Sequence, residues 1–241
     1  MTRADRYDDV IRFHGHECPG AGLGLRIAEV ATERLGRHDR GNEIVAVAET
    51  DSCAIDAVQV LTGCTYGKRN LQHEDNGKSA FTFWRRTDGA GLRVMARPGS
   101  DAFRDEDTWT LAEAIERGEA TDEQREQFAT RQQERIARIL DAPIEELLLV
   151  EELTGDVPQV KAVRPSEACE KCGDLTSVAT LHNHRGAMVC PPCHLAAHGG
   201  VMPPDHGSHD HGHSHPRAHV HGHGDDHSHP RAHAHGHDHQ H

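Results

Sequence analysis

The stretch Phe13-His14-Gly15-His16-Glu17-Cys18-Pro19-Gly20 decides how the first part of this chain folds. The residues before it, 7–13, are typical of a short helix that ends at the His-Gly-His turn. Proline and glycine then open a second helix over 21–35, whose apolar residues recur near helical spacing, and Gly36 ends it. The sequence therefore predicts two helices joined by a turn that gathers histidine and cysteine side chains.

A second block of polar residues follows a strand-like segment. Residues 43–49 have strand character and deliver Asp51 and Cys53 at their carboxyl end. Residues 53–61 are typical of a helix, which stops at Thr62-Gly63. Because each block holds soft or borderline metal ligands, the two blocks could converge on one metal ion.

The rest of the first domain shows a mixture of strand and helix patterns. Two strands joined by a turn, two charged helices and a last apolar strand are predicted in order at 79–86, 91–97, 109–117, 121–140 and 144–153. A proline-containing linker follows. These elements indicate an α+β domain over residues 1–160.

Four cysteines later in the chain have the spacing of a metal site. Seventeen residues separate the pairs Cys169-x-x-Cys172 and Cys190-x-x-Cys193. Two such pairs supply the four thiolates of a tetrahedral Zn²⁺ site. Such a site is closed, so it predicts a zinc-ribbon-like module over 166–200 that acts in folding or docking. The neighbouring histidines are interpreted as bystanders: His182, His184 and His194.

The first block could bind a metal ion of its own. In an extended turn His14, His16 and Cys18 project to one side, and Cys53 could meet them from the second block. Imidazole and thiolate suit a transition metal such as Zn, Ni, Fe or Co. Spacing alone leaves an alternative open, in which the cysteines are small buried hydrophobic residues and the histidines cap a turn.

Several residues beside these blocks have simpler explanations. Gly20, Gly22 and Gly24 resemble a dinucleotide-binding fingerprint, but no apolar strand precedes them, so close helix packing is favoured. Cys64 is placed in a loop within reach of the same pocket and is interpreted as structural. The flanking polar residues are interpreted as surface or capping groups: Asp51, Asp56, Lys68 and Lys78.

Residues 203–241 form a His-rich tail with an internal repeat. The segments 213–223 and 227–237 match with a fourteen-residue period. The tail has too little apolar surface to repay its ordering entropy, so we expect it to be disordered without metal. Neutral imidazoles would bind Ni²⁺, Zn²⁺ or Co²⁺ with weak selectivity, which favours metal buffering. The candidate ligands are His211, His213, His215, His219, His221, His223, His227, His229, His233, His235, His237 and His239.

Composition excludes some classes of partner. The chain has 39 Asp and Glu residues against 26 Lys and Arg residues, so no nucleic-acid partner is predicted. The sequence shows no apolar run long enough to span a membrane and no secretory signal, so no membrane partner is predicted. Seven cysteines, four of them in metal spacing, fit a reducing compartment. We therefore expect a cytoplasmic protein.

The two blocks together resemble the FmdE family, which is named after formylmethanofuran dehydrogenase, over roughly residues 7–160. The residues that carry the resemblance are the first block with Gly24-x-Arg26, the run Asp51–Leu71, Asp75-x-Gly77-Lys78 and Ala80-Phe81. The resemblance implies a compact α+β core with a mostly antiparallel sheet packed with helices, often as a homodimer. It also implies a metal-binding cleft formed by His14, His16, Cys18 and Cys53, with Asp51 nearby.

Two functions of different classes follow from these observations. The first is a metal-binding accessory protein that carries, buffers or delivers a transition metal, with a metalloenzyme or a metal-delivery protein as partner. In it, the tail raises the local metal concentration and the four-cysteine module is structural. The alternative is an enzyme or enzyme subunit in which the metal or a thiolate acts on a small substrate. Its catalytic candidates are Cys18, Cys53 and Asp51.

Overall fold

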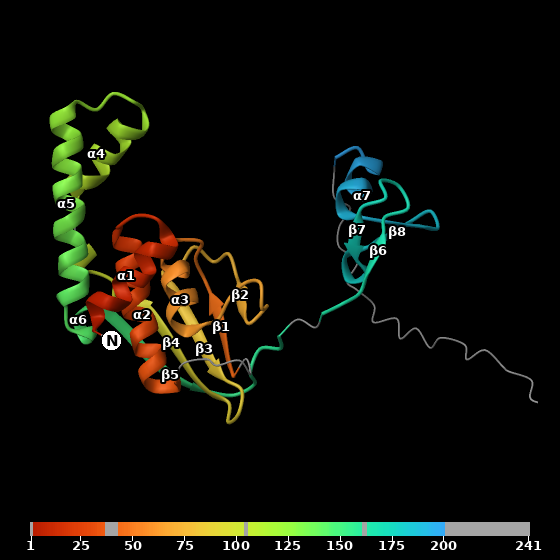
Figure 1. Ribbon diagram of the computed structural model, residues 1–241, viewed down its shortest axis with the longest axis horizontal. Coiled ribbons are helices and arrows are strands. Elements are labelled where there is room, and N and C mark those ends of the chain that lie inside the picture. Colours follow the sequence, from red (N-terminus) through yellow and green to blue (C-terminus); the bar gives the residue numbers. More distant parts are fainter. Residues whose placement is uncertain (1, 37–42, 104–105, 161–162, 201–241) are drawn as a thin grey trace, which may run out of the picture. The chain divides into compact units, whose positions relative to one another are not determined.

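The computed structural model describes residues 2–36, 43–103, 106–160 and 163–200. The chain divides into two compact units, 1–163 and 164–241, and each is considered by itself (Figure 1). The His-rich tail, with its predicted disorder and its candidate ligands, lies outside the described residues. No helix in the described part of the chain is both long and apolar enough to span a membrane.

The first unit is built on a five-stranded sheet with the order β2-β1-β3-β4-β5. Its strands are β1 (Ile44–Ala48), β2 (Leu71–His73), β3 (Ala80–Arg85), β4 (Ala90–Ala96) and β5 (Leu148–Thr154). The pair β1–β2 is parallel and every other pair is antiparallel. The predicted α+β class with a mostly antiparallel sheet is therefore confirmed. The short edge strand β2 was not predicted.

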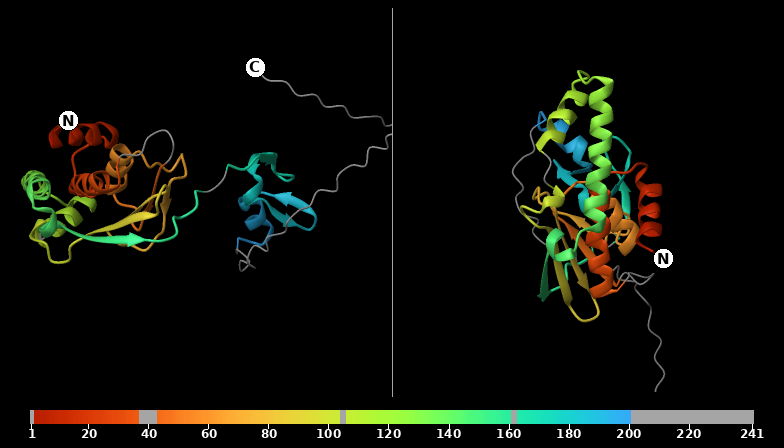
Figure 2. Two further views of the ribbon diagram at one scale, coloured as in Figure 1. Left: turned by 90° about the horizontal axis from the view of Figure 1, so that it is seen from below. Right: turned by 90° about the vertical axis from the view of Figure 1, so that its left-hand side faces the viewer.

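Three helices lie on one side of the sheet (Figure 2), namely α1 (Arg3–His14), α2 (Pro19–Leu35) and α3 (Ala54–Thr62). Helix α2 packs against β3 and β4, and α1 and α3 pack against α2. The core between helices and sheet includes Leu25 and Ile27 from α2 and Phe81 and Phe83 from β3, all fully buried. Both predicted helices at the start of the chain are confirmed, and Gly36 ends α2 as expected.

Helix α2 lies against α3 closely enough to require glycine. A Cβ atom on Gly24 would lie 2.3 Å from the carbonyl oxygen of Ala54, a separation that real Cβ atoms do not show. At Gly22 the added atom would meet Ile139 Cγ2 at 3.6 Å, an ordinary contact. Close helix packing, the favoured interpretation of this glycine run, is confirmed at Gly24.

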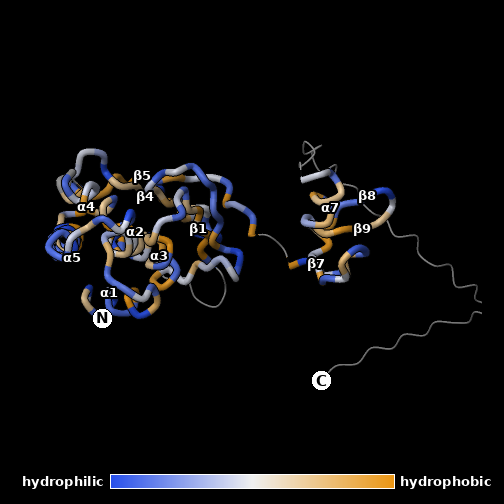
Figure 3. Tube along the Cα trace, turned by 90° about the horizontal axis from the view of Figure 1, so that it is seen from above, coloured by the Kyte–Doolittle hydropathy of each residue, from blue (hydrophilic) through white to orange (hydrophobic). Residues whose placement is uncertain are grey.

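Two further helices, α4 (Glu106–Glu116) and α5 (Asp122–Asp141), extend from the sheet as a hairpin (Figure 1). Helix α5, which is seen end-on in Figure 3, is largely hydrophilic. Its C-terminal part is fixed to α2 by a buried arginine. The guanidinium of Arg26 donates to the carbonyl oxygens of Leu140 and Ala142. These carbonyls at the helix end lack helical partners, so Arg26 acts as a C-terminal cap.

The predicted strand over 144–153 is wrong in its first four residues. Ile144–Leu147 forms a short helix, α6, and β5 begins only at Leu148. Pro143 occupies the N-cap position of α6, and two glutamates stand in its first turn, where they favour a helix N-terminus. The apolar run thus combines a helical turn with an edge strand.

The described part of the second unit, residues 164–200, contains two hairpins, a short 3-10 helix and one α-helix. Its elements are β6 (Ser166–Ala168), β7 (Leu175–Ser177), η2 (Val178–Thr180), β8 (His182–His184), β9 (Ala187–Val189) and α7 (Pro191–Ala197). β6 pairs with β7, and β8 pairs with β9, both antiparallel. Its buried apolar cluster is Cys169, Val189 and Cys190, with Ala187 and Cys193 packed against it. So small a core needs a further source of stability.

Candidate metal centres

The first block of the sequence lies between the end of α1 and the start of α2. Gly15 is the C-cap of α1, with the left-handed φ of 96° that glycine adopts at little cost. Cys18 is the N-cap of α2, and its Sγ accepts a hydrogen bond from the Ala21 N–H at 3.3 Å. Pro19 follows at the first helical position, where a missing N–H costs nothing. The backbone therefore brings the ends of two helices together around these side chains.

His14 is held in a defined orientation by a carboxylate. Its Nδ1 lies 2.7 Å from Asp56 Oδ2, and its side chain is 9% exposed. A carboxylate accepts hydrogen bonds, so Nδ1 carries the proton and Nε2 is the nitrogen left for other partners. Nε2 lies 3.5 Å from Cys18 Sγ. This is also the separation, about 3.5 Å, between the nitrogen and sulfur ligands of a tetrahedral zinc ion.

His16 completes a group of three donors. The ring centroids of His14 and His16 are 4.5 Å apart. One ligand atom each from His14, His16 and Cys18 lie within 4.8 Å of one another. His16 is exposed, whereas the other two are half-buried, so the group opens to solvent on the His16 side. The donor set of imidazole and thiolate fits a borderline transition metal.

Cys53 interacts with Cys18, although its sulfur is not among the three donor atoms that lie within 4.8 Å of one another. It occupies the N-cap position of α3, and a Cβ on Gly20 would come within 3.0 Å of Cys53 Cβ. Glycine at position 20 therefore makes room for the cysteine. Burial, together with the neighbouring Cys18 sulfur, raises the pKa of Cys53. Partial burial and the neighbouring sulfur disfavour negative charge on Cys53, and a cation bound between the two sulfurs would offset this penalty.

Three of the four flanking polar residues lie at the surface as expected, and Asp56 is the exception. Asp51 is exposed, and Asp56 is the carboxylate that contacts His14. Lys78 pairs with Glu49 at 3.6 Å, and Lys68 is exposed. The sequence indicated Asp56 only as a surface or capping residue. Its position three residues after Cys53, in the first turn of α3, was the signal for a role beside the cluster.

Cys64 does not belong to this cluster, and the expectation that it lies within reach of the same pocket is wrong. It is fully buried in the apolar core, and its Sγ contacts the carbonyl oxygen of Ile44 at 3.5 Å. Ile44 begins β1, whereas Cys53 follows the end of that strand. Burial raises the pKa of the Cys64 thiol to about 11. The residue is structural, as its interpretation stated.

Tyr7 is a neighbour of the cluster that the sequence analysis did not identify. It lies on α1 and is 6% exposed. Burial and the nearby Glu17 and Cys18 raise its pKa to about 12, so the phenol is neutral near pH 7. Seven residues before His14, or two turns of α1, it lies on the same helix face.

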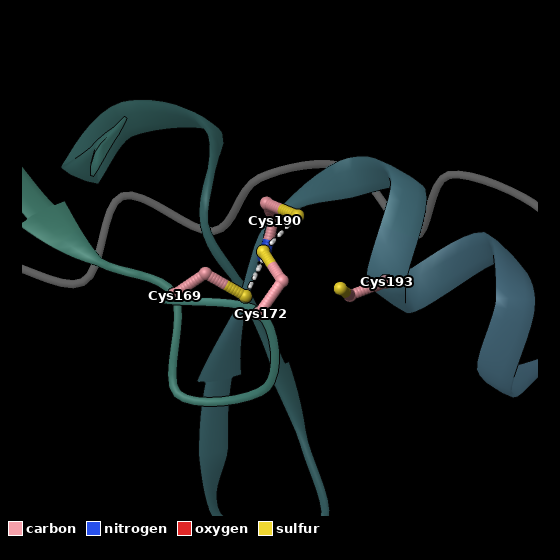
Figure 4. A group of neighbouring side chains, drawn as sticks. All are labelled: Cys169, Cys172, Cys190 and Cys193. Atoms are coloured by element: carbon pink, nitrogen blue, oxygen red, sulfur yellow. Dashed lines mark hydrogen bonds between the residues drawn. The ribbon is translucent and has the colours of Figure 1, made fainter. Parts of the chain in front are cut away.

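The four cysteines of the second unit come together as their spacing indicates (Figure 4). Their sulfur atoms lie within 4.8 Å of one another, and Cys172 Sγ is 3.8 Å from Cys190 Sγ. Adjacent sulfurs of a tetrahedral zinc site are about 3.8 Å apart. Backbone N–H groups of Cys172 and Cys190 lower the pKa of Cys169 to about 6, so they stabilise its thiolate. The cluster has the donors and the spacing to bind a metal such as zinc.

An α+β unit with a His/Cys cluster at its helix ends, followed by a four-cysteine unit, defines a class of metal-associated proteins. Residues 13–149 match the model of the family described as "FmdE, Molybdenum formylmethanofuran dehydrogenase operon". The chain therefore belongs to the FmdE family, and the resemblance stated from its motifs is confirmed. Family membership supports a metal-related accessory role at a coarse level.

Two known proteins illustrate the relationship. A curated protein of Archaeoglobus fulgidus, described as a "Probable S-adenosyl-L-methionine-binding protein", is 34% identical over 171 residues, which are 68% of this chain and 46% of that protein. The chain thus spans less than half of that relative. The crystal structure of a tungsten formylmethanofuran dehydrogenase FmdE-like protein from Syntrophus aciditrophicus matches with a TM-score of 0.53 and 20% identity. The matched region covers 80% of this chain and 92% of the Syntrophus protein. The structural match supports the fold.

Proposed function

We propose that the first unit binds one transition-metal ion through His14 Nε2, His16, Cys18 and Cys53, and carries or delivers that ion to a metalloprotein. The observation that supports this most strongly is the 3.5 Å contact between His14 Nε2 and Cys18 Sγ, with Asp56 behind the imidazole. A carboxylate on the far nitrogen of a metal-bound histidine fixes the ring and strengthens the ligand. The Asp56–His14 contact supports this role, because it leaves Nε2 directed toward Cys18.

The positions of the four proposed ligands favour exchange of the bound metal ion with solvent or with another protein. The ligands come from the ends of three helices, and His16 is exposed to solvent. A metal held there can be reached by an incoming ligand without unfolding of the core. The imidazoles of the tail sequence add weak sites on the same chain, which act at high effective concentration on a tighter site. We therefore assign the first unit the role of carriage and the tail that of buffering.

Thiolate catalysis at Cys53 is less well supported. A nucleophilic cysteine needs a lowered pKa, and burial raises the pKa of Cys53 instead. S-adenosyl-L-methionine binding is not carried over to this chain, because the chain spans less than half of the archaeal relative that has this description.

Elemental analysis of tag-free protein tests the proposal. The proteins compared are the full chain, a deletion of residues 205–241, and that deletion with Cys18→Ser and Cys53→Ser together. Each is purified without added metal and then dialysed against a defined transition metal. We expect the double variant to bind one ion fewer per chain than its parent deletion, and repeating the dialysis with different metal ions identifies the class of metal carried.

Cys64→Ser in the same deletion is the matched control, because this cysteine is buried away from the cluster. We expect it to keep the full metal content. Equal metal content in the double variant and its parent, with both folded, would contradict the proposal. Transfer is then measured by mixing the loaded deletion protein with a metal-binding dye. A carrier site releases its ion to the dye, whereas a permanent cofactor site retains it.

A further inference from the structure

The second unit contains a cluster of histidines separate from its four cysteines. His194 lies at the centre: its ring stacks on His182 with a centroid distance of 4.6 Å and contacts His198 at the same distance. His184 meets His194 at 5.9 Å and His198 at 5.1 Å, edge to face. One ring nitrogen each from His184, His194 and His198 lie within 4.8 Å of one another.

The local backbone explains why these rings meet. His182 and His184 alternate along β8 and so project to one face of the hairpin, whereas His194 lies on α7 and His198 is the C-cap of that helix, one turn later. The β8–β9 hairpin closes through Arg185 and Gly186, both with positive φ, as in a two-residue type I′ turn. This tight turn holds β8 in register, with His184 opposite Ala187.

One ring nitrogen in the cluster, Nδ1 of His194, is buried without a hydrogen-bond partner among the described residues. His194 as a whole is 8% exposed. A buried polar atom left unpaired costs free energy. Stacking between the rings accounts for their proximity but not for this nitrogen. A cation coordinated by the ring nitrogens of this cluster would supply the missing interaction.

We propose that His184, His194 and His198 form a second metal site in this unit, which binds a borderline divalent cation such as Zn²⁺, Co²⁺ or Ni²⁺. Three imidazoles with a fourth position open are a known donor set for such ions. The nitrogens of a tetrahedral site lie about 3.3 Å apart, so small rotations of the rings bring the present cluster to bonding distance. His182 is not a ligand in this site and supports His194 by stacking.

The two metal sites of this unit share one helix. Cys190 is the N-cap of α7 and Cys193 lies in its first turn, next to His194. A metal at the cysteines would therefore fix the helix that carries two of the three histidines. The cysteine site is closed by four thiolates, whereas the histidine site keeps a position for an exchangeable ligand. This inference is independent of the function proposed for the first unit.

Modification of histidines by diethyl pyrocarbonate, quantified at each residue by peptide mass spectrometry, tests the site in the full chain. Residue-level detection separates these histidines from those of the tail. Zn²⁺ is the probe. We expect saturating Zn²⁺ to slow the modification of His184 and His198 by about tenfold, because a coordinated imidazole nitrogen is no longer a free nucleophile.

The decisive variant is His194→Gln, compared with His182→Gln. His194→Gln should abolish the zinc-dependent protection of His184 and His198, whereas His182→Gln should retain it. Resistance of Cys172 to alkylation shows in each protein that the cysteine site is loaded and the unit folded. If His194→Gln loses that resistance, His198→Gln takes its place, with His184 as the reporter. Equal modification with and without Zn²⁺ in the native chain, or protection that survives the loss of His194, would overturn the proposal.

Discussion

His14 donates from Nδ1 to Asp56 Oδ2 over 2.7 Å, and its Nε2 faces Cys18 Sγ at 3.5 Å. A contact between α1 and α3 thus selects the nitrogen that is free to bind a metal. It also fixes the orientation of the His14 ring, so His14 is the better-oriented donor of the two histidines in the first block. His16, which is exposed, meets the site from the solvent side.

Replacing Asp56 should therefore weaken metal binding without removing a ligand. Asp56→Asn keeps an oxygen that can accept from Nδ1 but removes the negative charge that strengthens Nε2 as a donor. We expect the metal affinity of the first unit to fall by about 10- to 100-fold. Competition with a chromophoric chelator, on protein without residues 205–241, measures it.

Asp8→Asn is the matched control for this prediction, since it removes the same charge from an exposed position on α1 that is not part of the site. It should leave the affinity nearly unchanged. Equal losses in the two variants would indicate a general effect of negative charge instead of the orientation of His14.

Two glycines on α2 offer a comparison between packing and helix propensity. Gly24→Ala would place a methyl group 2.3 Å from the Ala54 carbonyl oxygen, so α2 and α3 must separate. We expect the first unit to lose about 1–3 kcal/mol of unfolding free energy, or more. Gly22→Ala meets only an ordinary contact with Ile139 and should stabilise the unit by up to about 1 kcal/mol. Urea unfolding followed by circular dichroism gives both values, and similar values for the two variants would contradict the packing argument.

The sequence predicted the helices and strands correctly where the local residue pattern and the tertiary packing favour the same structure. Helix α2 has an N-terminal Pro19, a C-terminal Gly36 and apolar residues at helical spacing, and each signal acts within the helix itself. The pair β3–β4 has strand patterns on either side of a turn. The four-cysteine cluster was predictable because its two Cys-x-x-Cys pairs encode most of the geometry.

The rest depended on contacts that no local pattern specifies. Strand β2 is three residues long and is formed by parallel pairing with β1, from a partner far away in the sequence. The apolar run over 144–153 has no period that separates a helical turn from a strand, so α6 was missed. Asp56 and Tyr7 join the site through helix packing. The histidines of β8 and α7 lie too far apart in sequence for their spacing to show that they meet.

The buried thiol of Cys64 should make the first unit sensitive to alkaline pH. Burial raises its pKa from 9.0 to about 11. Because the folded-state pKa is raised, the stabilising contribution is complete below pH 9 and is lost as the pH rises to about 11. The loss should reach about 2 kcal/mol of unfolding free energy at that pH and about 3 kcal/mol well above it. Denaturant titrations at a series of pH values measure it.

Cys64→Ser isolates this contribution, because serine does not titrate in the range. Tyr7 and Cys53, whose pKa values are also raised, act equally in both proteins and cancel in the difference. The difference in unfolding free energy between native and variant chains should therefore change between pH 9 and 11. A difference that stays constant with pH would show that Cys64 is less well shielded from water than its burial indicates.

Removing metal from the four-cysteine cluster should unfold the second unit alone. Its buried apolar cluster rests on Cys169, Val189 and Cys190, which is too small to offset the conformational entropy of the unit. Without a cation, four sulfurs within 4.8 Å of one another would also have to be held together as thiols or repelling thiolates. The first unit has its own core of helices on a five-stranded sheet. After treatment with a strong chelator, amide hydrogen exchange should therefore become fast across residues 166–198, while the amides of β1, β3 and β4 stay protected from exchange. Cys172→Ser should produce the same pattern without chelator. Protection of 166–198 that persists in both samples would mean that the hairpins and α7 are stable without metal, and the cysteines would then be better explained as a redox group than as a structural site.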